Sequence, residues 1–315
     1  MIPLSDASRR SRSRGAAVVM AMLLAALAAT IAATLLWQQQ RWIGEHQHRR
    51  DQVQAQALAM AGVQWTRQIL FDNAPAGSIV HLGQPWALRL PAMPIENGSI
   101  GGYIVDAQSR ININNLSTTS TAATSTRAAL QRLFAALALP PNLVNTVTDW
   151  VDADDKASDP GGAEDAWYLA QPIPTLAANA PVIRIGELLL VRDVGPASMT
   201  RARPFVAALD APTAVNVNTA PAEVLAATVG GLDPAAAALL VASRAKTPFT
   251  SVADFKTRLP RPDLVTDETS LDVRSDWFEV SIEAQQGDTL ARARALLKRS
   301  STAGEWPVVI WQTME

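Results

Sequence analysis

The amino-acid sequence predicts an α+β protein with a long N-terminal helix, an antiparallel sheet and a large inserted all-α domain. Residues 16–37 form an uncharged apolar run, and a helical pattern continues beyond it to Phe71. Strand-like segments occupy residues 79–114 and the stretch after 268, whereas the Ala- and Leu-rich residues 127–268 have a helical pattern. Strands on both sides of a helical block favour one α+β domain with an insertion over two domains in tandem.

The composition excludes several classes of protein. The chain has 315 residues, of which 48% are hydrophobic and 18% charged, which is too apolar for a disordered chain and too polar for a multi-span membrane protein. It has no cysteine, so it carries neither disulfides nor thiolate metal centres, and it has only three histidines. Nucleophile-elbow, Walker-loop and His-Glu-x-x-His motifs are absent from the sequence. We therefore expect a protein that is not an enzyme.

The apolar run predicts a single membrane span. Its 22 residues (16–37) would make a helix of about 33 Å, which crosses a hydrocarbon core of about 30 Å. A cleaved secretory signal is the alternative, but its apolar region is typically about 7–15 residues long. Four arginines and one acid precede the run, which predicts a cytoplasmic start. We expect a bacterial inner-membrane protein with most of its chain in the periplasm.

Residues 38–71 predict an amphipathic continuation of this helix. Apolar residues recur at spacings near three, four and seven, with one longer gap, and the helix is expected to stop at residues 73–77. Packing against the chain's own domain accounts for such a stripe, and so does packing against a partner helix. The stripe consists of Trp42, Val53, Leu58, Ala61, Trp65 and Ile69.

The N-terminus resembles the class III signal of type IV pilins and pseudopilins, with a short basic leader ending at Gly15 before the apolar helix. The resemblance implies that a prepilin peptidase cleaves between Gly15 and Ala16 and methylates the new N-terminus. Most members have Glu at the fifth mature position, where this chain has Met20. A carboxylate there would neutralise the N-terminal ammonium of a neighbour in a low-dielectric core, and Met20 cannot do so. This departure is similar to the minor pseudopilin GspK family of type II secretion.

Further motifs of that family follow in the same order along the mature chain. They are found at Asp106 with residues 110–116, and at residues 150–155, 162–169, 179–181, 187–192 and 216–221. The resemblance implies a leader (1–15), a transmembrane helix (16–37), a pilin-like domain in two parts (38–116 and 269–315) and an inserted α-helical domain (117–268).

The resemblance also implies a function and partners. Such a protein would be at the tip of the pseudopilus and nucleate its assembly, so that folded periplasmic proteins are exported. Its partners would be GspI-like, GspJ-like and GspH-like minor pseudopilins, the major pseudopilin and the prepilin peptidase.

Seven acidic residues and one lysine lie between Asp149 and Asp165. Such crowding favours a bound cation, and calcium takes about six to eight oxygen ligands, although the spacing is not that of an EF-hand. The resemblance implies calcium in the α-helical domain as well. A solvated acidic loop is the alternative, and a glycosidase-type carboxylate pair is disfavoured. The candidate ligands are Asp152, Asp154, Asp155, Asp159, Glu164 and Asp165.

A membrane-tethered DNA-binding protein is the competing function. Residues 216–255 resemble the helix-hairpin-helix modules of DNA receptors, whose Gly-rich hairpins hold phosphate with backbone amides. Here Asp233 takes the second glycine position, and Asp193 takes the first position of another candidate hairpin. Residues 117–268 contain 12 Lys and Arg against 16 Asp and Glu, so we expect no nucleic-acid partner.

Two local expectations concern turns and caps. Residues 99–105 and 110–114 flank a four-residue turn of the composition that predicts a β-hairpin. The repeated Asn-x-Asn phrase predicts that asparagine side chains cap the starts of helices. The asparagines concerned are Asn112, Asn114, Asn216 and Asn218.

Overall fold

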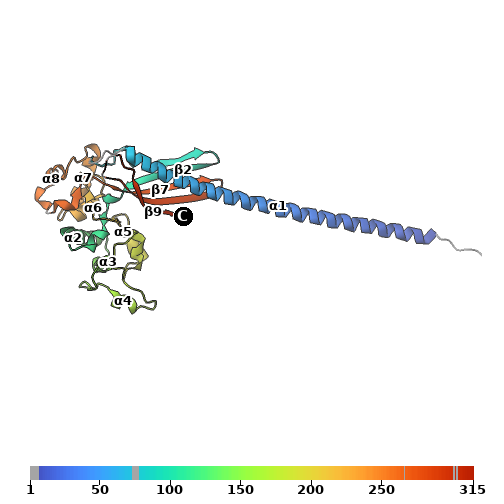
Figure 1. Ribbon diagram of the computed structural model, residues 1–315, viewed down its shortest axis with the longest axis horizontal. Helices are drawn as coiled ribbons and strands as arrows, with labels where there is room; N and C mark the ends of the chain where they lie inside the picture. Colours follow the sequence, from blue (N-terminus) through green and yellow to red (C-terminus); the bar gives the residue numbers. More distant parts are fainter. Residues whose placement is uncertain (1–6, 73–77, 266, 301, 303) are drawn as a thin grey trace, which may run out of the picture.

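The computed structural model describes residues 7–72, 78–265, 267–300, 302 and 304–315 (Figure 1). Helix α1 (Ala7–Asp72) is continuous through the predicted leader, the apolar run and the amphipathic segment. At about 1.5 Å per residue its 66 residues extend to about 99 Å. The first six residues of the leader and the predicted stop at residues 73–77 lie outside the described residues.

A five-stranded antiparallel sheet packs against the C-terminal third of α1 (Figure 1). Its strand order is β1-β2-β7-β8-β9, so the chain leaves the sheet after its second strand and returns to pair β2 with β7. The long helix on an antiparallel sheet confirms the predicted fold class. The strands are β1 (Leu90–Ile95), β2 (Gly98–Asp106), β7 (Trp277–Gln286), β8 (Thr289–Lys298) and β9 (Val308–Met314).

The chain between β2 and β7 is mainly helical and has its own apolar core. Leu130, Leu133, Val224, Phe249 and Phe255 are among its buried side chains. A separate core lies between α1 and the sheet. The helices are α2 (Thr121–Ala136), α3 (Leu143–Val151), α4 (Asp165–Leu169), α5 (Pro196–Ala202), α6 (Ala222–Thr228), α7 (Pro234–Lys246) and α8 (Val252–Thr257).

The hairpin predicted around residues 106–109 is wrong. Residues Ala107–Ser109 form a 3₁₀ turn, η2, and the following strand β3 (Ile111–Asn112) has only two residues. It pairs in parallel with β4 (Val206–Ala207), far away in sequence, whereas β2 pairs with β7. Asp106 explains the change of direction, because its buried carboxylate accepts a hydrogen bond from the Gln108 N–H at 2.9 Å and closes the turn.

The four asparagines do more than cap helices. Asn112 does cap the 3₁₀ helix η3 (Ile113–Ser117), because its Oδ1 accepts from the Asn114 N–H at 3.1 Å. Asn114, however, pairs its amide with the backbone of Val182, donating at 2.9 Å and accepting at 3.0 Å. The residue at the N-terminal cap of α6 is Pro221, and no side chain caps this helix, so Asn216 and Asn218 do not have the predicted role there. The side-chain amides therefore hydrogen-bond backbone segments that are distant in sequence. A capping rule that considers only neighbouring residues does not predict such contacts.

Asp106 also joins the two cores. Its Oδ2 accepts hydrogen bonds from Asn216 Nδ2 at 3.0 Å and from the hydroxyls of Thr219 and Ser275 at 2.6 Å each. Burial is the largest cause of a raised pKa for this carboxyl, and the hydrogen bonds oppose it. One buried carboxylate thus ties the end of β2 to the start of α6 and to the segment that re-enters the sheet.

Candidate functional site

Helix α1 packs on the sheet through small side chains. Ala55, Ala59 and Val63 are fully buried there together with Leu70. Gly62 completes this face, and a Cβ built on it would lie 2.7 Å from Ile282 Cγ2 of β7. Small residues let the helix backbone approach the strands closely, so its bulky apolar side chains are left on the other sides.

Several bulky apolar side chains of α1 point into solvent. The exposed fractions are 64% for Trp42, 65% for Val53, 50% for Met60 and 48% for Trp65. Of the predicted stripe, only Leu58 and Ile69 pack against the sheet core, and both are partly buried. Packing on the chain's own domain therefore does not explain the stripe. Trp42, Val53 and Met60 lie on one side of the helix and Trp65 on another, and we call Trp42, Val53 and Met60 the free apolar face of α1.

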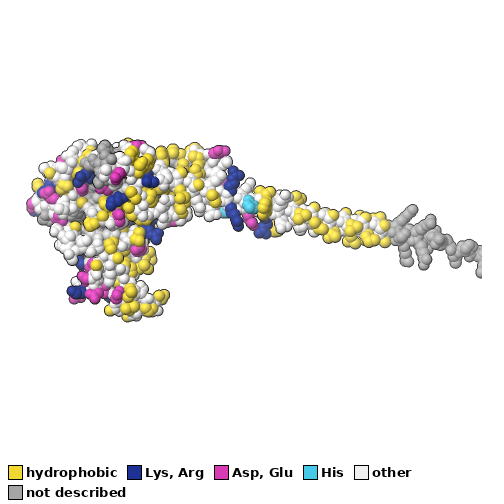
Figure 2. All heavy atoms as spheres, in the orientation of Figure 1, with side chains coloured by type: hydrophobic (Ala, Val, Ile, Leu, Met, Phe, Trp, Pro, Cys, Tyr) yellow, Lys and Arg dark blue, Asp and Glu magenta, His cyan; other side chains and the backbone are white. Residues whose placement is uncertain are grey.

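Residues 15–50 of α1 make no contact with the rest of the described chain that would bury them. Every described side chain from Gly15 to Arg50 is exposed, and Figure 2 shows apolar side chains along this rod. The helix is long and apolar enough to cross a membrane. Met20 is 62% exposed, and no heavy atom lies within 4 Å of a Cβ built on Gly15. Residues 15 and 20, at the predicted cleavage site and the fifth mature position, are thus both exposed, and the chain has one helix suited to serve as a single membrane anchor.

Asp149 organises the acidic loop that follows α3. It is fully buried, and its Oδ2 accepts from the backbone N–H groups of Ser158 at 3.0 Å and Ala163 at 2.7 Å. Gly162 is required beside it, because an added Cβ would collide with that carboxylate. Sequence reasoning included Asp149 in the acidic run but missed this role. Its position next to Trp150, in a helix whose Leu143, Val144, Val147 and Val151 are apolar, is the signal of a buried acid.

Glu164 and Asp152 are left with unpaired oxygens in this loop. Glu164 is 5% exposed, and neither of its carboxylate oxygens has a hydrogen-bond partner in the structure; one buried oxygen of Asp152 also lacks one. Burial, followed by the charges of Asp149, Asp152, Asp154 and Asp165, raises the pKa of Glu164 to about 7. Burial, followed by Asp154 and Asp149, raises the pKa of Asp152 to about 6. An uncompensated anion of this kind is suited to binding a cation.

The other predicted ligands are arranged differently. Asp154 accepts from the Lys156 N–H at 2.9 Å, and Asp165 accepts from the Ala177 N–H at 2.9 Å. Asp155 and Asp159 are exposed. Over the part of the chain that the structure describes, no three acidic or histidine side chains converge closely enough to hold a metal ion. The loop therefore brings the charges of Asp152 and Glu164 close together. The other predicted ligands either accept hydrogen bonds from backbone N–H groups or are exposed.

The two candidate DNA hairpins are occupied by their own acids. Asp233 caps α7, where its Oδ1 accepts from the Ala235 N–H at 2.8 Å. Asp193 adopts a left-handed φ of 63°, and its Oδ2 accepts from Asn142 Nδ2 at 2.8 Å. The backbone amides that would hold a phosphate at α7 are therefore already paired with a carboxylate.

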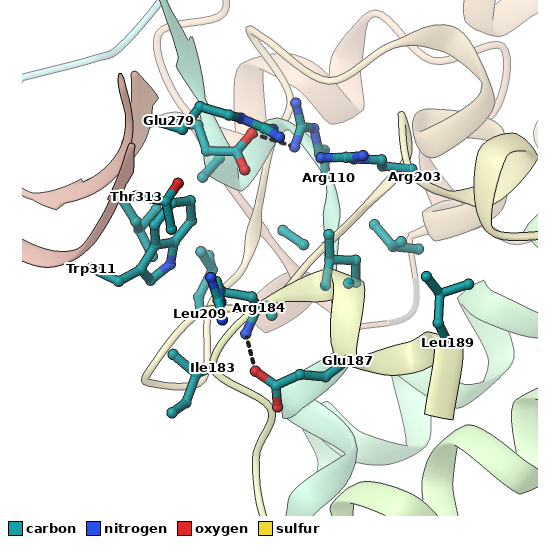
Figure 3. Close-up of a pocket in the computed structure, with 18 of the residues that line it drawn as sticks. Arg110, Ile183, Arg184, Glu187, Leu189, Arg203, Leu209, Glu279, Trp311 and Thr313 are labelled. Carbon is teal, nitrogen blue, oxygen red and sulfur yellow. Dashed lines mark hydrogen bonds and ion pairs between the residues drawn. The ribbon is translucent and has the colours of Figure 1, made fainter. Parts of the chain in front are cut away.

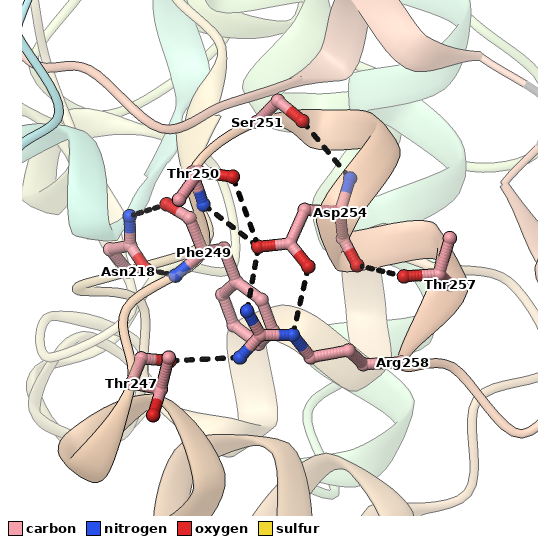
Figure 4. A network of polar contacts seen from close by, with 8 residues as sticks. All are labelled: Asn218, Thr247, Phe249, Thr250, Ser251, Asp254, Thr257 and Arg258. Carbon is pink, nitrogen blue, oxygen red and sulfur yellow. Dashed lines mark hydrogen bonds and ion pairs between the residues drawn. The ribbon is translucent and has the colours of Figure 1, made fainter.

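The region after α7 is held by a polar network (Figure 4). Asn218 pairs its side-chain amide with the Phe249 backbone, donating at 2.9 Å and accepting at 2.8 Å. Asp254 receives two hydrogen bonds from Arg258, at 2.9 and 2.6 Å, and one from the Thr250 N–H at 2.9 Å. These contacts fix loops within the helical part, which is a structural role.

Comparisons with known proteins agree on one family. Two family models described as type II secretion system protein K match residues 109–211 and 215–274. The protein K of Klebsiella pneumoniae is 30% identical over 91% of this chain and 93% of its own. That of Pectobacterium carotovorum is 30% identical over 92% and 94%, and that of Pseudomonas aeruginosa is 29% identical over 89% and 86%.

A solved structure supports the fold independently. It is the GspK-GspI-GspJ complex of the type 2 secretion system of enterotoxigenic Escherichia coli, and one of its chains matches this one with a TM-score of 0.74 at 24% identity. The match covers 86% of this chain and 99% of the other. Family models match the helical part between β2 and β7, and a relative that is 30% identical aligns over 91% of the chain, so this chain belongs to the type II secretion system protein K family, also called GspK.

Proposed function

We propose that this chain is a minor pseudopilin that joins GspI-like and GspJ-like subunits through the free apolar face of α1. The observation that carries the proposal is that bulky apolar side chains face solvent on a helix whose small residues already pack on its own sheet. Exposed apolar patches of this kind mark protein interaction sites. The similar solved structure is a complex with GspI and GspJ, which supports these partners.

We place the chain at the tip of the pseudopilus. The helical part lies at the end of α1 away from the anchor and extends to one side (Figure 1). A further subunit stacked above it along the helix axis would clash with this mass. In addition, Met20 offers no carboxylate to the amino end of a neighbouring subunit, so growth is favoured on one side only. Such a subunit nucleates assembly, with GspH-like and major pseudopilins added below it.

The proposed location and processing follow from the same helix. The chain spans the bacterial inner membrane once, through residues 16–37, and its bulk lies in the periplasm. A prepilin peptidase cleaves between Gly15 and Ala16 and methylates the new amino group.

Two experiments test this function. Full-length chain with and without the substitution Gly15→Leu is expressed in the secreting bacterium, and the membrane-extracted protein is sequenced from its N-terminus. We expect Ala16 as the first residue of the wild type and an uncleaved leader in the variant. Gold-labelled antibody against this chain is expected at one end of sheared pseudopili, and label distributed along the fibres would contradict the tip position.

We also propose that calcium binds the acidic loop. Glu164 and Asp152 are suited to hold it because their buried oxygens have no partner among the described residues, and Asp154 and Asp165 add negative charge there. Asp155 and Asp159, which are exposed on the same loop, would have to move to become ligands. Bound calcium neutralises this charge and cross-links the loop.

The calcium proposal is tested by melting the full chain in detergent with calcium or with EGTA. We expect a higher melting midpoint with calcium and a much smaller difference in Glu164→Gln. The exposed Asp263→Asn serves as the control and is expected to respond like the wild type. An EGTA-insensitive midpoint in the wild type would remove calcium from the proposal.

A further inference from the structure

A cavity of about 530 Å³ lies between the sheet and the helical part. One wall is the face of the sheet opposite α1, because Phe278 and Val280 alternate with Glu279 and pack on the helix side. Leu296 and Trp311 belong to the same wall as Glu279, since the three pair across adjacent strands. The opposite wall comes from the segment of residues 183–190 and from residues 203–209 (Figure 3). The candidate functions discussed above leave this cavity unused.

Arginine dominates the charge of the cavity. Arg110, Arg184, Arg203 and Arg294 line it, against Glu187, Glu279 and Glu315. Two of these acids already have partners: Glu279 pairs with Arg110 at 2.8 Å, and Glu187 accepts from the backbone N–H of Arg184 at 2.9 Å.

Among the described residues, only Arg110 of these four arginines has a partner for its guanidinium group, and that of Arg184 has none. The side chains of Arg203 and Arg294 make no ion pair or hydrogen bond with the described residues. They come from opposite walls, Arg203 from the end of α5 and Arg294 from the middle of β8. Figure 3 shows Arg203 extending toward Arg110 along one side of the cavity. An occupant with negative charge would meet both groups.

The rest of the lining is mainly apolar, and the indole N–H of Trp311 is a further donor in it. Ile183 and Leu190 expose 65% and 66% of their surface at the rim. The indole N–H of Trp311 is buried and has no hydrogen-bond partner in the structure. An occupant that fits must therefore bring apolar side chains and a hydrogen-bond acceptor as well as an anion.

We propose that this cavity binds an extended, acidic segment of a partner protein. Its carboxylates pair with Arg203 and Arg294, a backbone carbonyl accepts from the Trp311 N–H, and its apolar side chains cover Ile183 and Leu190. An extended segment in which acidic and apolar residues alternate carries both kinds of side chain along its whole length. A polyanion such as nucleic acid fits poorly, because it brings no apolar side chains to cover Ile183 and Leu190.

The test uses the full chain in lipid nanodiscs and a fluorescein-labelled nonapeptide in which glutamate alternates with valine and isoleucine. Its matched control has lysine in place of each glutamate, and a third peptide keeps the glutamates but has serine in place of each apolar residue. We expect the first peptide to bind, with an affinity that falls as salt rises. The lysine and serine peptides should bind at least about tenfold more weakly.

Charge reversal separates the proposal from nonspecific attraction. The double variant Arg203→Glu with Arg294→Glu should lower the affinity for the acidic peptide by about tenfold, which is about 1.4 kcal/mol. It should raise the affinity for the lysine peptide. The exposed Arg261→Glu changes charge outside the cavity and should leave both affinities unchanged. Equal binding of the acidic and lysine peptides, no detectable binding of the acidic one, or an unaffected double variant would each overturn the proposal. None of these outcomes depends on assembly through α1.

Discussion

Gly62 of α1 and Ile282 of β7 are so close that a Cβ on the glycine would lie 2.7 Å from the isoleucine Cγ2. This approach decides which side of α1 packs on the sheet and which side stays free. It predicts that Gly62→Leu forces the helix away from β7 and lowers the free energy of unfolding by about 1–3 kcal/mol. Gly44→Leu is the matched control, because nothing lies within 4 Å of its Cβ position in the same helix. Urea unfolding of both variants, followed by circular dichroism, checks the prediction, and equal stabilities would contradict it.

The free apolar face predicts a loss of assembly without a loss of stability. Trp42→Ser and Val53→Ser remove exposed side chains that the chain's own sheet does not bury, so the free energy of unfolding should change by less than about 0.5 kcal/mol. Co-purification with GspI-like and GspJ-like subunits should fall strongly. Lys246→Ser, an exposed change on the helical part, should leave co-purification intact. If the α1 variants still co-purify fully, another surface makes the contact.

The acidic loop predicts that stability depends on pH. Because the pKa of Glu164 is about 7 in the folded chain and near 4.5 when unfolded, the folded state binds the proton more tightly. In EGTA the free energy of unfolding should therefore fall as pH rises from about 4.5 to about 7 and then level off.

Glu164→Gln should flatten this dependence and be more stable than the wild type at pH 8 by roughly 1–3 kcal/mol. Denaturant titrations at pH 5 and pH 8 make the measurement, and the exposed Glu223→Gln should follow the wild-type profile. A profile that Glu164→Gln leaves unchanged would show that this carboxyl is ionised in the folded chain without penalty.

Asp106 predicts coupling between the two cores. Asp106→Ala leaves the donors of Asn216, Thr219 and Ser275 buried without their acceptor, which should cost at least about 3 kcal/mol. Because these bonds join the sheet to the helical part, calorimetry should show the single transition of the wild type dividing into two. The exposed Asp288→Ala is the control and should melt as one transition near the wild-type midpoint.

Much of this architecture was predictable because it depends on patterns local in the sequence. The apolar run, the helical continuation to residue 71 and the strands near 99–105 and 277–298 follow from hydrophobic periodicity, and the structure has them in those places. The predicted hairpin at residues 106–109 is wrong because the composition of a four-residue turn does not show with which strand the following residues pair. Pairing with residues 206–207 determined the outcome.

The candidate sites also depend partly on the sequence alone and partly on the tertiary structure. The sequence by itself determined which residues are acidic, where the apolar run begins, and that Met20 carries no charge, because these are facts of composition and order. Only the tertiary structure decided that Glu164 is buried without a partner among the described residues, that Trp42 and Val53 face solvent, and that Arg203 and Arg294 line one cavity. Burial and proximity depend on contacts between residues far apart in the chain, and no local spacing encodes them.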